Sequence, residues 1–242
     1  MKSKKFLIAG TIALLCQSTV SAQPERRRAW DDIDSNVVRR DTITKEGFTL
    51  IWVEKETAFV DSTRTRMIET FFTTYPKQIA LYNKEGRRTV RIVIDPEYKG
   101  VAAAGGGVIR VNPEWMIKNP QDIDVVTHEG MHVVQSYPGG AGPGWITEGV
   151  ADYVRHKMGV NNKAGNWSLT PFRDSHHYTN AYRITARFFV WIESKHGNDF
   201  VKKLDNAMRT KTYTEAFWKE QTGKTVDELW DTYKTDPRIE GI

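Results

Sequence analysis

The feature that most restricts the fold is the stretch THEGMHVVQ at residues 127–135, which places two histidines four residues apart. Apolar residues at helical spacing surround it, so a helix from about 122 to 136 is predicted. In such a helix His128 and His132 lie on one face, and both imidazoles can reach one metal ion. Glu129 is turned by about 100° from His128, so it can instead reach a water on the metal. The alternative is an ordinary helix whose histidines are hydrogen-bonded core or surface residues.

A second helix is predicted for WITEGVADYVRHK at 145–157, after a chain reversal rich in glycine and proline. A short connection of this kind packs two helices antiparallel. Glu148 can then complete a His–His–Glu set and leave one position to water, as catalytic zinc requires. Asp152 lies one turn further on the same face and can accept the outer N–H of a ligand histidine. The alternative is that both carboxylates are ordinary solvated or ion-pairing residues.

Hydrolysis at such a metal also needs a donor for the developing oxyanion. Tyr182 is the first candidate for this catalytic role, and Tyr178 is the second. His177, in a polar loop, is a candidate for the wall of the cleft. Arg187 can bind a substrate carboxylate or hold a structural one, and the structural role is favoured. The strand GVIRV at 107–111 is a candidate for an exposed edge to which an extended substrate adds.

These segments resemble a known family, the plant basic secretory proteins and their bacterial relatives, a group of zinc peptidases of gluzincin type. The resemblance rests on THEGMHVVQ, ITEGVADYVRHKMG, AYRITARFFVWIE and GKTVDELWDTY, and it spans roughly residues 48–235. It implies that His128, His132 and Glu148 are metal ligands. It also implies that Glu129 is the general base and that Asp152 is a carboxylate behind the ligands. One departure is Gly130, where many plant members have a bulkier residue; it is expected to face away from the metal.

The order of predicted elements indicates an α+β protein of zincin-like class, with a small mixed or antiparallel N-terminal sheet, an active-site helix pair and a helical C-terminal part. A hairpin is predicted first, then two helices separated by a start at Pro76, then a strand, a glycine-rich bend and a second short strand. The hairpin strands are 37–44 and 48–54, and the two helices are 58–73 and 76–84. The next strand is 89–95, the glycine-rich bend is 101–107 and the second short strand is 107–113.

The first 22 residues have the order of a secretory signal peptide: a basic start, an apolar run and small residues ending at Ala22. A membrane anchor and a lipidated Cys16 are the alternatives. Residues 23–35 read as a flexible lead-in, and residues 36–242 as a single zincin-like metallopeptidase domain. The only cysteine leaves with the signal peptide, so any metal site must use His, Asp or Glu.

Removing the three lysines of the signal peptide lowers the formal net charge from +5 to +2, so nucleic-acid binding is not expected. The mature chain is expected to be monomeric, without a membrane span, and secreted or periplasmic. It is predicted to hydrolyse peptides or proteins with one Zn²⁺ per chain and a zinc-bound water activated by Glu129. Two alternatives stay open: a non-cleaving binding or defence-type module that retains the fold, and a zinc hydrolase of cell-wall peptide or amide-linked glycan.

Overall fold

The computed structural model describes residues 33–241. The predicted signal peptide and most of the lead-in therefore lie outside the described residues. All described helices and strands belong to one compact unit, Asn36–Ile242. In chain order they are β1 (Arg39–Lys45), β2 (Phe48–Glu54), α2 (Asp61–Tyr82), β3 (Thr89–Ile94), β4 (Ala102–Gly105), β5 (Val108–Val111), α3 (Pro113–Lys118), α4 (Val125–Gln135), α5 (Gly144–Met158), η1 (Tyr178–Asn180), α6 (Tyr182–His196), α7 (Phe200–Arg209), α8 (Ala216–Thr222) and α9 (Val226–Thr235).

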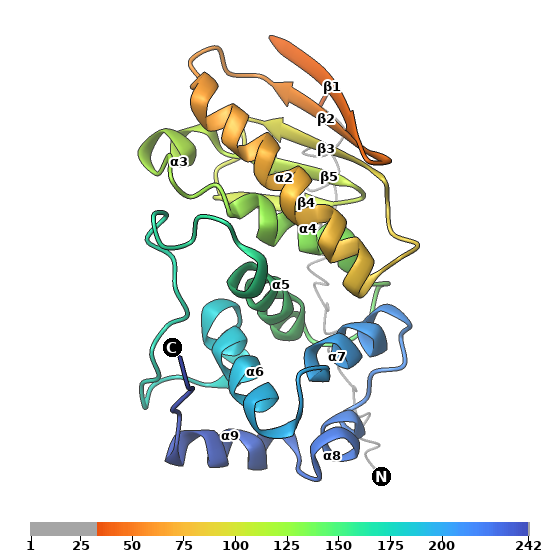
Figure 1. The fold of residues 1–242 in the computed structure, drawn as a ribbon, viewed down its shortest axis with the longest axis vertical. Helices are drawn as coiled ribbons and strands as arrows, with labels where there is room; N and C mark the ends of the chain where they lie inside the picture. The colour runs from red at the N-terminus through yellow and green to blue at the C-terminus, as the bar shows by residue number, and fades with distance from the viewer. Residues whose placement is uncertain (1–32, 242) are drawn as a thin grey trace, which may run out of the picture. The chain divides into compact units, whose positions relative to one another are not determined.

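The strands form a five-stranded mixed sheet in the order β1-β2-β3-β5-β4 (Figure 1). β1 and β4 are antiparallel to their neighbours, whereas β2, β3 and β5 run parallel to one another. The predicted hairpin is confirmed, and its two-residue turn uses Glu46 and Gly47, both with positive φ. The α+β class is also confirmed, with the sheet first along the chain and the helices after it.

The prediction that GVIRV forms the exposed edge is wrong, because β5 is paired on both sides and β4 is the edge strand. The predicted bend at 101–107 is also wrong in part. Its alanines form β4, and only Gly106 and Gly107 make the turn, with φ of 60° and 89°. Alanine and glycine have weak strand propensity, so the ladder to β5 decides this structure.

Helix α2 is a single helix that continues through Pro76, so the prediction of two helices divided at this residue is wrong. An interior proline costs about 3 kcal/mol because one backbone hydrogen bond is lost. The helix persists because its buried face, which includes Met67, Phe71 and Tyr75, packs into the core below the sheet. Tertiary packing therefore offsets an unfavourable local residue.

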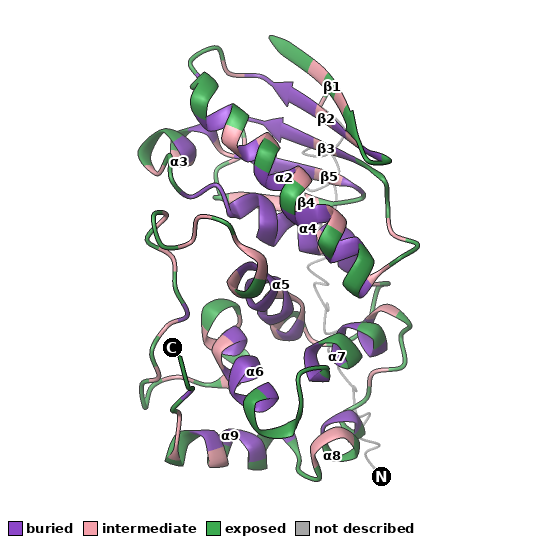
Figure 2. Ribbon diagram, viewed as in Figure 1, coloured by how far each residue is buried: buried purple, intermediate pink, exposed green. Residues whose placement is uncertain are grey.

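Helix α4, predicted from the opening motif, lies between α2 and α5, and all but one of its residues are buried (Figure 2). The predicted second helix is α5, which packs against both α4 and α6. In the C-terminal third, large aromatic rings are buried in the core, among them Trp218 and Trp230. No helix within residues 33–241 has the length and apolar character to cross a membrane.

Candidate active site

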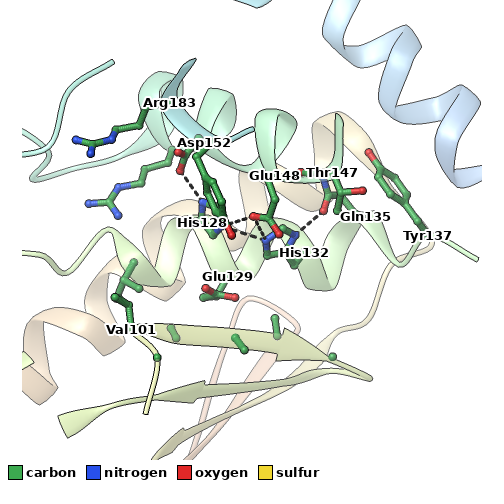
Figure 3. A pocket seen from close by; sticks show the side chains of 18 of the residues that line it. Val101, His128, Glu129, His132, Gln135, Tyr137, Thr147, Glu148, Asp152 and Arg183 are labelled. Atoms are coloured by element: carbon green, nitrogen blue, oxygen red, sulfur yellow. Dashed lines mark hydrogen bonds and ion pairs between the residues drawn. The ribbon is translucent and has the colours of Figure 1, made fainter. Parts of the chain in front are cut away.

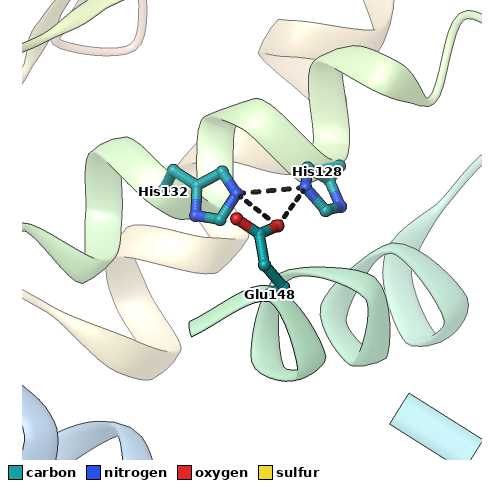
Figure 4. A group of neighbouring side chains, drawn as sticks. All are labelled: His128, His132 and Glu148. Atoms are coloured by element: carbon teal, nitrogen blue, oxygen red, sulfur yellow. Dashed lines mark hydrogen bonds and ion pairs between the residues drawn. The ribbon is translucent and has the colours of Figure 1, made fainter. Parts of the chain in front are cut away.

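Helices α4 and α5 bring His128, His132 and Glu148 together at one point (Figure 4). The Nε2 atoms of the two histidines are 3.0 Å apart. Each Nε2 is 3.3 Å from Oε2 of Glu148. The helical spacing of the histidines and the antiparallel helix pair therefore place these side chains as the sequence predicts.

The outer nitrogens of both histidines are held by buried partners. Nδ1 of His128 lies 2.7 Å from Oδ1 of Asp152, as predicted. Nδ1 of His132 lies 2.7 Å from Oε1 of Gln135, while Nε2 of Gln135 donates to the carbonyl oxygen of Thr147. When both Nδ1 atoms donate a hydrogen, both Nε2 atoms keep a lone pair, and these lone pairs face Glu148.

This donor set fits Zn²⁺. Two imidazole nitrogens and one carboxylate oxygen are a set that catalytic zinc uses, with a fourth position left for water. Donors about 2.0–2.1 Å from a tetrahedral ion are separated by about 3.3–3.4 Å, close to the spacings found between these three atoms. Without a cation, two lone pairs and a carboxylate would face one another at close range.

The protonation equilibria of the cluster also indicate a need for positive charge. Burial lowers the pKa of His128, but hydrogen bonds to Asp152 and Glu148 outweigh burial and raise it to about 10. Burial raises the pKa of Glu148, but its contacts with both histidines outweigh burial and lower it to about 2. The cluster therefore holds a proton where a metal ion would otherwise supply the charge.

Glu129 lies beside the cluster and is not part of it (Figure 3). Its Oε2 is buried and has no hydrogen-bond partner among the described residues. Burial raises the pKa of Glu129, against the charges of His128 and His132, which lower it. A buried carboxylate with a raised pKa and a free oxygen is suited to accept a proton.

These residues line one cavity of about 1340 Å³. Tyr182, at the start of α6, also lines it and stacks on His128 with ring centroids 6.3 Å apart. The Tyr182 side chain is 54% exposed. Its backbone and that of Ala181 have positive φ, a conformation that residues other than glycine rarely adopt. The ring is thus held at the mouth of the site.

Other candidate residues are not brought to this cavity. The hydroxyl of Tyr178 donates to Asp227, and the ring of His177 packs against that of Tyr178. Arg187 donates from a terminal nitrogen to the carbonyl oxygen of Pro237, at a separate and smaller cavity. Arg187 thus contacts a backbone carbonyl of the C-terminal segment, and not the carboxylate that the sequence suggested.

The cavity also contains residues to which sequence reasoning assigned no role. Gln135 is three residues after His132, and this spacing alone places both on one helix face. Tyr98 donates its hydroxyl to the carbonyl oxygen of Ala102 in β4, and Arg183 follows Tyr182 directly. No local signal marks Tyr98 or Arg183, because their positions depend on how the sheet and α6 pack around α4.

The family model described as a peptidase of plants and bacteria matches residues 33–233. The chain belongs to this family. The resemblance that the motifs suggested is thereby confirmed, and the cavity described above is the candidate active site of a peptidase.

Among solved structures, this peptidase is similar to an M1 zinc metallopeptidase from Deinococcus radiodurans, with 12% identity and a TM-score of 0.49 over 81% of this chain and 51% of that one. It is also similar to an aminopeptidase N family protein from Idiomarina loihiensis, with 12% identity and a TM-score of 0.45 over 84% and 45% of the two chains. The chain thus spans about half the length of these proteins. Comparison with curated protein sequences gives no match.

Proposed function

We propose that this peptidase is an exported, zinc-dependent metallopeptidase that hydrolyses peptide bonds in peptides or proteins. His128, His132 and Glu148 would hold one Zn²⁺. The observation that carries the proposal is the convergence of three metal-binding atoms, spaced 3.0–3.3 Å apart, while the outer nitrogens of both histidines are held by other residues.

When bound, zinc lowers the pKa of water and polarises a carbonyl group. Glu129 then takes a proton from the attacking water and delivers it to the leaving amine. The free Oε2 of Glu129 and the upward shift of its pKa by burial support this role. Asp152 holds the His128 ring in orientation through Nδ1.

Tyr182 donates its hydroxyl to the oxygen of the substrate carbonyl as negative charge develops there. Its support is its place against His128 at the mouth of the cavity. Burial and the neighbouring carboxylates of Glu148 and Asp152 raise the pKa of Tyr182, so the hydroxyl keeps its hydrogen at neutral pH. Tyr178 is not proposed for this role, because its hydroxyl is bonded to Asp227.

Strand β4 is the wall on which an extended substrate would lie. Val101 accepts a backbone hydrogen bond from Asn112, so by the alternation of an antiparallel ladder Ala102 and Ala104 direct their backbone groups outwards. The hydroxyl of Tyr98 donates to the carbonyl oxygen of Ala102, whereas within residues 33–241 the backbone N–H and C=O of Ala104 remain available to a substrate strand. The proposed substrate-binding edge is therefore β4, the neighbour of the strand β5 that the sequence suggested.

Export by a signal peptide at residues 1–22, with secretion or a periplasmic location, remains part of the proposal. So does a monomeric mature chain that binds no nucleic acid. The low net charge left after removal of residues 1–22 supports the last point.

The test is to purify the mature chain and a Glu129→Gln variant, measure zinc content, and assay hydrolysis of casein and a broad peptide library. We expect about one zinc per chain in both proteins, and a loss of at least about 100-fold in kcat for the variant. A well-folded protein that takes up no added zinc would reject the ligand assignment. Zinc binding without cleavage of any peptide would favour the non-cleaving module, or a hydrolase of cell-wall peptide or amide-linked glycan.

A further inference from the structure

Two arginines line the cavity that contains the metal cluster. They are Arg155 and Arg183, and Val101, Trp115 and Trp167 line the same cavity. Figure 3 shows the side chain of Arg183 directed away from His132. The two arginines differ in their surroundings: Arg155 is buried and ion-paired, whereas Arg183 is exposed at the wall of the cavity.

The charge of Arg155 is balanced within the fold. Its guanidinium forms a buried ion pair with Asp122 and a hydrogen bond to Asn162, and it lies over the ring of Trp167. Asp122 also accepts a hydrogen bond from the indole of Trp115. Arg155 therefore shapes the wall and has little remaining capacity to bind an anion.

The charge of Arg183 is not balanced in this way. The part of the chain that the structure describes provides no hydrogen bond or ion pair to its side chain. Arg183 is the second residue of α6, a helix of 15 residues whose first turn has no side-chain cap. A helix N-terminus disfavours a cation and attracts an anion, so helix stability does not explain an arginine here.

We propose that Arg183 binds a carboxylate group of the substrate, and this inference rests on the proposed peptidase function. A guanidinium matches a carboxylate with two parallel hydrogen bonds, and the uncapped first turn of α6 adds to the attraction. Arg183 directly follows Tyr182, which stacks on His128. Since an extended chain advances about 3.3 Å per residue, the carboxylate belongs about one to three residues from the bond that is cut.

Two sources supply the same carboxylate chemistry: the C-terminus of a short peptide, and an Asp or Glu side chain within a longer one. A first set of quenched peptides compares a free C-terminal carboxylate with a C-terminal amide, each a few residues from the cut bond. A second set has both ends blocked and compares Asp or Glu with Asn or Gln at the same positions. The proteins are wild type, Arg183→Gln and, as a control of equal charge, Arg173→Gln, whose residue is exposed and outside the cavity.

In wild type we expect kcat/KM to favour the carboxylate peptides of one set by about tenfold or more, through KM. The Arg183→Gln variant is expected to lose this preference and to cut the uncharged peptides within about twofold of wild type. The Arg173→Gln variant is expected to keep the preference. The set that shows the effect identifies the source of the carboxylate.

A binding measurement separates this inference from the proposed function. Calorimetry compares carboxylate and amide peptides with the Glu129→Gln variant, with and without Arg183→Gln. If no peptide is cut but carboxylate binding depends on Arg183, the proposed hydrolysis fails and the inference stands. If peptides are cut but the carboxylate preference is absent, or unchanged by Arg183→Gln, the inference is overturned.

Discussion

At the scale of single residues, Gln135 is the side chain that joins the two helices of the site. Its amide oxygen lies against Nδ1 of His132, and its amide nitrogen donates to Thr147, the residue before Glu148 (Figure 3). One buried amide thus orients one proposed ligand and holds the backbone beside another. Such partners fix the tautomer and ring orientation of ligand histidines.

Replacement of this amide should weaken the metal site. We expect Gln135→Leu to lower zinc affinity by about 10–100-fold, because His132 loses the acceptor that sets its tautomer and orientation. Affinity is measured by competition with a chromogenic chelator. Gln78→Leu is the matched control, because Gln78 is also buried and donates to Thr127 in the same helix but forms no hydrogen bond with either histidine. Equal zinc affinity in the two variants would contradict the role of Gln135.

At the scale of elements, the site depends on close packing of α5 against α6. A Cβ added at Gly149, the residue after Glu148, would lie 2.3 Å from Cγ2 of Thr185. A Cβ added at Gly144, at the start of the same helix, would meet nothing within 4 Å. Glycine is thus required at one position of α5 by a neighbouring helix and is dispensable at the other.

These two glycines give a matched pair of substitutions. We expect Gly149→Ala to lower the free energy of unfolding by about 1–3 kcal/mol through overpacking. Gly144→Ala should leave it unchanged or raise it by up to about 1 kcal/mol through helix propensity. Urea unfolding of both variants measures the difference. A Gly149→Ala variant as stable as wild type would show that α6 is free to move away from α5.

The space around an added Cβ also shows which way Gly130 faces within HEGMH. A Cβ there would lie 3.1 Å from Oε1 of Gln78 and 3.4 Å from the ring of Tyr75, both in α2. Gly130 therefore faces α2 and not the cavity, as expected from the spacing along the helix. The departure from the plant members is accommodated by packing against α2, at a distance from the proposed chemistry.

At the scale of the whole molecule, the site lies within an extensive apolar core, so metal should add stability without being required for folding. A ligand that binds only the folded state, at a free concentration of about 1,000 times its Kd, raises the free energy of unfolding by about 4 kcal/mol. For a chain of this size we expect zinc to raise Tm by roughly 10 °C relative to protein in EDTA. Calorimetry on metal-free and zinc-loaded protein measures this shift.

The increase in Tm caused by zinc should grow with pH. In the metal-free protein the pKa of His128 is about 10, against about 6.5 in an unfolded chain. The bound proton therefore stabilises the metal-free fold fully below about pH 6.5, and this contribution is lost as pH rises towards 10. Zinc competes with that proton, so its effect on Tm should increase from pH 6 to pH 8. A shift that is constant or falls with pH would contradict the raised pKa.

The sequence alone predicts which residues form the centre of the candidate site. His128, His132, Glu148 and Asp152 were predicted because helical periodicity and a short helix–loop–helix connection place them with few alternatives. These are local constraints, acting within about thirty residues of chain. The hairpin of β1 and β2 was predicted for the same reason, since its turn and alternating strands are adjacent in sequence.

Only the tertiary structure decided the surroundings of that centre. It made alanines 102–104 the edge strand, kept α2 continuous through Pro76, and brought Arg183 instead of Arg187 to the cavity. Each outcome depends on contacts between segments distant in sequence, which can outweigh a local preference of a few kcal/mol. The proposed chemistry of this peptidase is therefore specified locally, and its proposed substrate contacts are specified by long-range packing.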